Sequence, residues 1–181
     1  MKWLTALLVS LGIVAPAPKA PVEVAAPAPC AAPCAMSETG YSLVRTFEGY
    51  MPFPYKDVAG IETVGYGYVI RPGDALTYPL LPPAADALLK REMALFERDI
   101  NHSVRVPVYQ YQFDALASLT YNIGPAAFRG STVLKRVNMK EHVLVPDSFL
   151  MWNKARIDGV LQPVRGLTLR RQEEANLYAG K

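Results

Sequence analysis

The sequence has few cysteines and few histidines, two of each in 181 residues. Both cysteines, Cys30 and Cys34, lie close to the N-terminus, so the longer part of the chain that follows has no disulfide of its own. Their spacing lacks the two further ligands that a structural zinc site needs, and the histidines have no acidic or cysteine partners at metal spacing. We therefore expect no metal site. In an oxidising compartment the cysteines could pair with each other or across two chains, and otherwise they are idle thiols.

The sequence also lacks a concentrated run of charge of either sign. The formal net charge is +3, and residues 36–181 carry +2 of it, because they hold 17 basic and 15 acidic side chains. Without a basic stripe, nucleic acid is not the default partner, whereas weak basicity suits an enzyme that meets an anionic polymer. Since 51% of the residues are hydrophobic, the chain can bury the core of one ordinary domain.

No apolar run reaches the roughly 20 residues that cross a bilayer comfortably. The longest uncharged run, Trp3 to Pro18, follows Lys2 and precedes an Ala/Pro-rich tract from Pro21 to Ala35. A positive start, an apolar stretch and small residues beyond it are typical of an export signal. Because about 17 residues can suffice to span, anchorage in a membrane stays open. A disordered tail retained in the cytoplasm is the alternative.

The chain therefore divides into three parts. We expect a signal peptide or signal-anchor at 1–20, a Pro/Ala-rich linker at 21–36 and one folded domain at 37–181. The domain begins with a predicted helix at about 38–48, because Ser37 can cap it and Gly49 ends its apolar pattern.

The domain is predicted to mix one small sheet with several helices. Prolines and then a β-branched, glycine-punctuated stretch predict a small antiparallel sheet within 50–74. The apolar spacing of 84–101 predicts a long helix that joins two lobes. The second lobe is predicted to be all helical, with helices at 110–122, 130–138, 147–153 and 167–178.

Three polar side chains, Glu48, Asp57 and Thr63, are the candidates for chemistry. Hydrolysis of a glycosidic bond needs one protonated carboxylic acid and one ionised carboxylate. Glu48 lies beside aromatic residues at the carbonyl end of a helix, which predicts a raised pKa, and Asp57 in a polar turn is better placed to stay ionised. Alone the pair is weak evidence, because most surface carboxylates are simply solvated.

The order and spacing of these residues resemble a known family. Phe47-Glu48-Gly49 is followed by Asp57 after eight residues and by Thr63 after five more, which resembles the signature of the phage-type lysozymes (endolysins, glycoside hydrolase family 24). The second half is similar to the family's helical lobe in order and approximate spacing: Val106-Pro107, Gln112-Phe113-Asp114-Ala115-Leu116, Tyr121-Asn122-Ile123-Gly124, Ala127-Phe128, Ser131-Thr132, Leu134, Asn138, Phe149, Trp152, Gly166-Leu167, Arg170-Arg171 and Glu174.

The resemblance implies an α+β, two-lobed lysozyme-like fold, in which a small β-hairpin lobe and a larger all-helical lobe are joined by a long helix. It implies an active-site cleft between the lobes, no cofactor, and hydrolysis of the β-1,4 bond between N-acetylmuramic acid and N-acetylglucosamine in peptidoglycan, which lyses bacteria. Glycan strands are the expected partner, and the protein is expected to be a monomer. With the export signal, it would reach the periplasm of a Gram-negative host or stay tethered to the inner membrane; otherwise it waits in the host cytoplasm before lysis.

The resemblance also implies a role for particular residues. Glu48 falls on the general acid, Asp57 on the carboxylate that activates or positions water, and Thr63 on the group that orients that water, with inversion at the anomeric carbon. Arg170 falls on a basic partner of the acid, which would lower the pKa of Glu48 and so oppose burial. Asn122, near a helix end, caps that helix or binds sugar.

Two further observations complete the expectation. Tyr66 in the hairpin is a candidate for substrate binding, and Tyr68 stands where the family usually has a histidine, which we interpret as structural. The rival functions are a peptidoglycan-binding module without catalysis, a lytic transglycosylase and a membrane-disrupting protein. The retained set of Glu48, Asp57 and Thr63 favours hydrolysis over the first two. Membrane disruption would survive the loss of Glu48, so a lysis assay on a Glu48→Gln variant separates it from hydrolysis.

Overall fold

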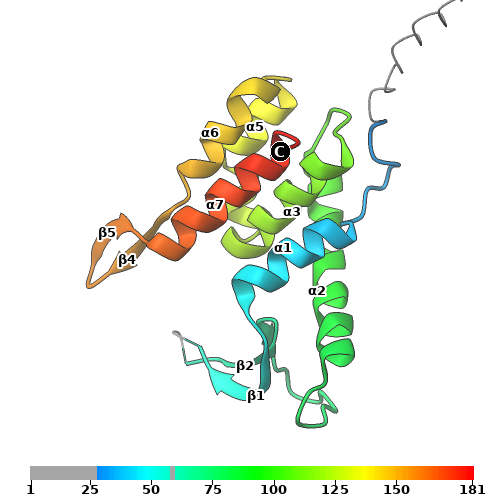
Figure 1. Ribbon diagram of the computed structural model, residues 1–181, viewed down its shortest axis with the longest axis vertical. Coiled ribbons are helices and arrows are strands. Elements are labelled where there is room, and N and C mark those ends of the chain that lie inside the picture. The colour runs from blue at the N-terminus through cyan, green and yellow to red at the C-terminus, as the bar shows by residue number, and fades with distance from the viewer. Residues whose placement is uncertain (1–27, 58–59) are drawn as a thin grey trace, which may run out of the picture.

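The computed structural model describes residues 28–57 and 60–181, and these form two lobes (Figure 1). The predicted signal segment and the first part of the predicted linker lie outside the described residues. The first helix, α1 (Glu38–Glu48), leads from the larger lobe into a small antiparallel sheet. The α+β, lysozyme-like fold expected from the sequence is confirmed, except that the second lobe also contains a β-hairpin.

The sheet of the small lobe consists of β1 (Met51–Lys56), β2 (Glu62–Gly65) and β3 (Tyr68–Val69), paired in that order. The β1–β2 register shifts between Met51 and Tyr55, where two prolines remove backbone donors from the ladder. One face packs on a small core made of Val64, Tyr68, Leu80, Ala85 and Leu88.

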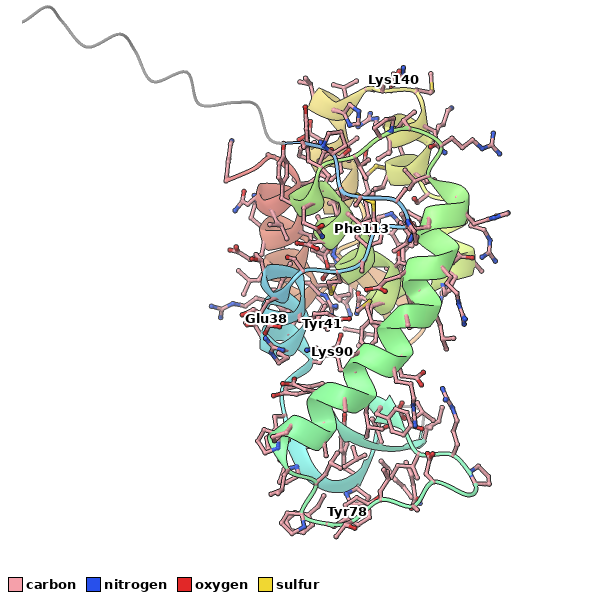
Figure 2. The ribbon with its side chains drawn as sticks, turned by 90° about the vertical axis from the view of Figure 1, so that its right-hand side faces the viewer. Glu38, Tyr41, Tyr78, Lys90, Phe113 and Lys140 are labelled. Carbon is pink, nitrogen blue, oxygen red and sulfur yellow. A yellow bond between two sulfur atoms is a disulfide. The ribbon has the colours of Figure 1, made fainter. Side chains whose placement is uncertain are left out.

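Helix α2 (Pro82–Ser103) joins the two lobes, as Figure 2 shows. Its 22 residues span about 33 Å at 1.5 Å per residue. Leu88 at one end belongs to the core of the sheet lobe, and Met93 and Ile100 further along belong to the core of the helical lobe. The long connecting helix predicted from the sequence is thus confirmed and is two residues longer at each end.

The helical lobe is built around α3 (Gln110–Ile123), whose residues 112–120 are all buried. Around it lie α4 (Pro125–Arg129), α5 (Thr132–Asn138), the 3₁₀ turn η1 (His142–Leu144), α6 (Val145–Leu150) and α7 (Arg165–Tyr178). Because α7 packs against both α3 and α6, its side chains reach the centre of the molecule.

The prediction of an all-helical second lobe is wrong. Strands β4 (Lys154–Ile157) and β5 (Val160–Pro163) form a hairpin between α6 and α7, and it projects from the lobe (Figure 1). Asp158 and Gly159 both have positive φ angles, 49° and 80°, as a tight two-residue hairpin turn requires. The hairpin is largely exposed, so it forms from local pairing and turn chemistry without the burial that drives the rest of the fold.

The described N-terminal residues, 28–36, pack against the helical lobe. Cys30 and Cys34 form a disulfide with each other, which is the first of the alternatives left open by the sequence. The Cys30 N–H donates to the Val108 carbonyl at 2.9 Å, and the Asn101 side chain bonds both the N–H and the carbonyl of Cys34 at 2.8 Å. We call residues 28–36 the N-terminal strap.

Within the described ranges, no helix combines the length and the apolar character that crossing a membrane requires. The segment predicted to be a signal-anchor is not among those residues.

Candidate active site

Glu48 is the last residue of α1, so its carboxylate lies at the carbonyl end of the helix, where the dipole does not favour it. Gly49 ends the helix with a φ of +71°, and its N–H donates to the Arg45 carbonyl at 3.1 Å. The chain then turns directly into β1. The Glu48 side chain, 21% exposed, is therefore fixed at the junction of the two lobes.

Arg170 on α7 forms an ion pair with Glu48. Its Nη1 donates to Glu48 Oε1 at 2.6 Å, and the arginine side chain is only 4% exposed. The guanidinium carbon also lies 5.7 Å from the centre of the Phe47 ring. The structure thus brings together two residues that are 122 positions apart in the sequence.

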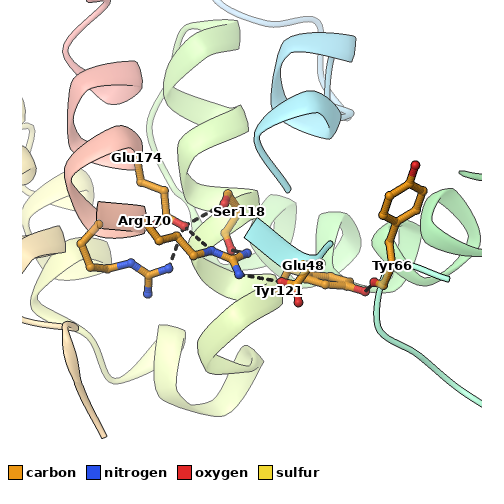
Figure 3. A network of polar contacts seen from close by, with 7 residues as sticks. Glu48, Tyr66, Ser118, Tyr121, Arg170 and Glu174 are labelled. Carbon is orange, nitrogen blue, oxygen red and sulfur yellow. Dashed lines mark hydrogen bonds and ion pairs between the residues drawn. The ribbon is translucent and has the colours of Figure 1, made fainter. Parts of the chain in front are cut away.

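A buried polar network in the helical lobe holds Arg170 in place (Figure 3). Arg170 Nε lies 3.2 Å from Glu174 Oε1, and its Nη2 donates to the Ser118 carbonyl at 3.2 Å. The Ser118 hydroxyl and Arg171 Nη2 both donate to the same Glu174 oxygen, at 2.7 and 2.8 Å. The network thus joins two arginines with two carboxyl groups.

Burial shifts the pKa values of Glu174 and Arg171 in opposite directions. Desolvation raises the pKa of Glu174, against the opposing effect of Arg171 and Arg170, and desolvation lowers the pKa of Arg171. Neither Arg171 nor Glu174 has any exposed side-chain surface. Charges placed this deep depend on one another, because an uncompensated buried charge is costly.

The opposite side of the site is a surface turn in the sheet lobe. The Asp57 carboxylate accepts the Ile61 N–H at 2.9 Å, and the Asp57 N–H donates to the Ile61 carbonyl at 3.0 Å. Thr63, at 3% exposure, donates its hydroxyl to the same carbonyl at 3.1 Å. Asp57 and Thr63 are therefore joined through Ile61.

Tyr55 connects this turn electrostatically to Glu48. It pairs with Thr63 across β1 and β2. Burial raises the pKa of Tyr55, and the charges of Glu48 and Asp57 raise it further. Both carboxylates therefore act on one phenol, which places the three groups in the same region of the molecule.

The turn between β2 and β3 closes the site from the sheet lobe. A Cβ at Gly67, where φ is +83°, would lie 3.5 Å from Glu48 Oε2 and 3.7 Å from the Tyr121 hydroxyl. That hydroxyl donates to the Tyr66 carbonyl at 3.0 Å. Glu48 thus presents one carboxylate oxygen to Arg170 and the other to the glycine turn.

The candidate substrate residues occupy different positions. The Tyr66 side chain points away from Glu48 (Figure 3), and its ring centre lies 5.6 Å from that of Tyr50. Asn122 is exposed near the end of α3, and the helix ends through the Gly124 N–H bonded to the Thr120 carbonyl. Of these two candidates, Tyr66 is connected to the site through its carbonyl, which accepts the Tyr121 hydroxyl.

Tyr68, which follows the glycine turn, is a buried residue of the sheet lobe. It is 2% exposed, and its hydroxyl donates to Asp74 Oδ2 at 2.7 Å. The guanidinium carbons of Arg91 and Arg71 lie 5.0 and 5.5 Å from the centre of its ring. These contacts are those of a structural side chain between the sheet and α2.

Sequence reasoning gave no role to two residues that the structure brings to the site, Ser118 and Tyr121. Tyr121 stands directly before Asn122 in the Tyr-Asn-Ile-Gly motif, which was a usable signal. Ser118 is a polar position inside a buried helix, and buried polar groups need partners. Within the described ranges, no cluster of three or more His, Cys, Asp or Glu residues is arranged to hold a metal ion.

In this arrangement, Arg170 binds one oxygen of the Glu48 carboxyl group, and the other oxygen faces the backbone turn at Gly67. A second carboxylate, Asp57, and a hydroxyl, Thr63, lie on the opposing lobe. Two carboxyl groups on opposite sides of a scissile bond are what glycoside hydrolysis requires.

Comparison with known proteins identifies the family. Residues 45–174 match the model of the phage lysozyme family. The endolysin of Salmonella phage P22 is 38% identical over 77% of this chain and 95% of its own length. The SAR-endolysin of Enterobacteria phage P21 is 33% identical over 77% of this chain and 81% of its own length.

A solved structure gives the same result. The endolysin from Escherichia coli O157:H7 phage FAHEc1 superposes with a TM-score of 0.73 at 34% identity, over 80% of this chain and 92% of that chain. Family model, sequence relatives and fold all agree. The chain belongs to the phage lysozyme family.

Proposed function

We propose that this protein hydrolyses the β-1,4 bond between N-acetylmuramic acid and N-acetylglucosamine, with Glu48 as the general acid and Asp57 as the carboxylate that activates or positions water. The class of activity follows from the family: the chain is an endolysin, a glycosidase that degrades peptidoglycan. The observation that carries the assignment of the acid is the position of Glu48, paired with Arg170 at the junction of the lobes.

Glu48 has two oxygens with different surroundings. Oε1 is held by Arg170, and Oε2 faces the turn at Gly67. The proton that is given to the leaving sugar oxygen therefore resides on Oε2. Once it has left, the guanidinium stabilises the negative carboxylate that remains, because an opposite charge at contact distance favours the ionised form.

Thr63 orients the attacking water, and Asp57 activates it. The Thr63 hydroxyl donates to the Ile61 carbonyl, so its oxygen keeps lone pairs that can accept a hydrogen from the attacking water. Asp57 takes the proton that this water loses. Attack from the face opposite the leaving group inverts the anomeric carbon.

The substitution Glu48→Gln tests the assignment. The glutamine keeps the shape of the side chain but has no acidic proton to give, so cleavage of purified peptidoglycan should fall by roughly 10²–10⁴-fold or more. Glu38→Gln, on the same helix but exposed, is the matched control and should keep its activity.

Two outcomes would contradict the proposal. Substantial cleavage by a folded Glu48→Gln protein would remove Glu48 from the acid role. Mass spectrometry of the products decides the reaction type, because hydrolysis leaves plain reducing ends, and 1,6-anhydromuramic ends would identify a transglycosylase instead.

Asn122 and Tyr66 complete the proposal as substrate-binding residues. The Asn122 amide is exposed near the C-terminal end of α3, and Tyr66 lies in the turn that faces Glu48, with its carbonyl bound by the Tyr121 hydroxyl. Asn122→Ala should raise KM for soluble glycan fragments while kcat stays nearly constant. A change in kcat alone would assign it to positioning.

We also propose that residues 1–20 deliver the enzyme across the inner membrane or tether it there, and that the enzyme acts as a monomer. The charge and apolar pattern of that segment support delivery, as do relatives named SAR-endolysins. Expression of the full chain in a Gram-negative host should cause lysis that depends on secretion. A chain that begins at Ala28 keeps the N-terminal strap and should accumulate without lysis; equal lysis from both would contradict delivery by the leader.

A further inference from the structure

Tyr121 links the two lobes beside Glu48. It lies on α3, in the helical lobe, and its hydroxyl donates to the Tyr66 carbonyl in the turn between β2 and β3 at 3.0 Å. Figure 3 shows the Tyr121 ring running past Glu48 to this carbonyl. The bond is thus a direct connection from the central helix to the part of the sheet that faces the acid.

The surroundings of Tyr121 keep this donor in place. Its ring meets Phe96 of α2 edge-on, with ring centres 5.2 Å apart. Burial raises the pKa of Tyr121, and the charge of Glu48 raises it further, so the phenol stays protonated and can donate. A fixed ring with a permanent donor sets the position of the carbonyl that it binds.

The turn that Tyr121 holds is the turn that faces Glu48. A Cβ added at Gly67 would lie 3.5 Å from Glu48 Oε2, at van der Waals contact, so the glycine backbone lies next to the oxygen that Arg170 does not bind. The same turn follows β2, which carries Thr63 and pairs with β3 through Val64 and Tyr68. Movement of the turn would therefore shift the sheet relative to the acid.

We propose that Tyr121 is a positioning residue for catalysis: its hydroxyl fixes the β2–β3 turn against Glu48 and so sets the separation between the acid and the lobe that carries Asp57 and Thr63. The inference rests on the proposed function. It concerns alignment and assigns Tyr121 no contact with the sugar.

The substitution Tyr121→Phe removes the hydroxyl and keeps the ring. Loss of one hydrogen bond that aligns the lobes should reduce kcat on soluble, uncrosslinked glycan strands by about fivefold or more, the fold-change that corresponds to one net hydrogen bond. KM should change less than about twofold, since every side chain proposed to bind substrate is retained. Amide hydrogen exchange in the turn should become faster.

Tyr50→Phe is the matched control. The Tyr50 hydroxyl also donates to a backbone carbonyl, that of Leu80, but this bond stays on the sheet side of the molecule. The control therefore loses a bond of the same kind without loosening the contact between α3 and the turn. It should keep kcat even where its unfolding temperature falls.

The outcomes separate the inference from the function. Unchanged kcat in Tyr121→Phe, or an equal loss of kcat in Tyr50→Phe, overturns the positioning role. Failure of the wild-type protein to cleave the strands contradicts the proposed function instead. If Tyr121→Phe does not fold, Gly67→Ala displaces the same turn, because its φ of +83° disfavours a side chain; unchanged kcat there also overturns the inference.

Discussion

Different interactions hold the two sides of Glu48 in place: a buried ionic network on the helical side and hydrogen bonds in a surface turn on the sheet side. On the helical side, Arg170, Arg171 and Glu174 form a network with at most 4% of any side chain exposed. On the sheet side, Asp57 lies in a surface turn held by short-range hydrogen bonds to Ile61. Charges that are buried together depend on one another for stability, whereas a surface turn can lose a charge without a large penalty. The comparison predicts that stability and activity can be separated by choosing the side.

The largest expected effect is on the sheet side, in activity alone. Asp57→Asn keeps an oxygen that can accept the Ile61 N–H, so the turn is preserved, but it loses the base. Cleavage of peptidoglycan should fall by roughly 10²–10⁴-fold, and thermal unfolding should stay within the range of surface substitutions. Glu62→Gln, exposed in the same lobe, is the control. A large fall in stability with Asp57→Asn would contradict the claim that the sheet side can lose a charge without a large penalty in stability.

The second prediction concerns the helical side, where the effect should be on folding. Glu174→Gln leaves Arg171 buried with its counter-charge removed, so the free energy of unfolding should fall by about 3–5 kcal/mol. Urea denaturation measures it. Glu173→Gln, the exposed neighbour on α7, should change stability by less than about 0.5 kcal/mol. Equal values for the two variants would show that the buried network is not what stabilises this side.

The N-terminal strap sharpens the comparison, because it belongs to the helical lobe but lies away from the acid. Replacement of Cys30 and Cys34 by serine opens a very short loop and should cost about 2 kcal/mol. Activity at low temperature should be unchanged. Reduction of the wild-type protein should reproduce the same shift in unfolding, and loss of activity in the folded serine variant would connect the strap to the site.

The smallest effect is expected in the β4–β5 hairpin. Leu161 is 59% exposed, so Leu161→Ser should alter the free energy of unfolding by less than about 0.5 kcal/mol. A matched change in the core, Leu116→Ala at 0% exposure, should cost about 2–5 kcal/mol. Similar losses for both would mean that the hairpin is buried against another surface in solution.

The sequence predicted best those elements whose ends are marked by residues such as glycine and proline. Helix α1 has the predicted bounds, and Gly49 ends it as expected. The expected cap by Ser37 is wrong, because its side chain makes no capping hydrogen bond and donates to Asp114 instead. Helix α2 begins two residues before the predicted start, because prolines are accepted in the first helical turn and Pro82 and Pro83 occupy it. The missed β4–β5 hairpin had a readable signal, Asp158-Gly159, but its apolar residues are exposed and supply no buried face.

The contacts of the site could not be predicted from local sequence patterns, because they join residues that are far apart in the sequence. The pairing of Glu48 with Arg170 was expected only through the family resemblance, because no local pattern relates residues 122 positions apart. Ser118 and Glu174, 56 positions apart, meet only once α3 and α7 are packed. The sequence could not predict the hydrogen-bond acceptor of the Tyr121 hydroxyl, because the acceptor is a backbone carbonyl and every turn contains backbone carbonyls.

The strap also determines where a mechanical pull on the N-terminal side of the domain would be felt. Force applied at residue 28 reaches the Cys30–Val108 bond and then the two bonds from Asn101 to Cys34 before it reaches α1. Those contacts pass the tension to α2, which carries Asn101, and to the segment that leads into α3. Such a pull would therefore load α2 and the segment before α3 ahead of α1, the helix that ends in Glu48.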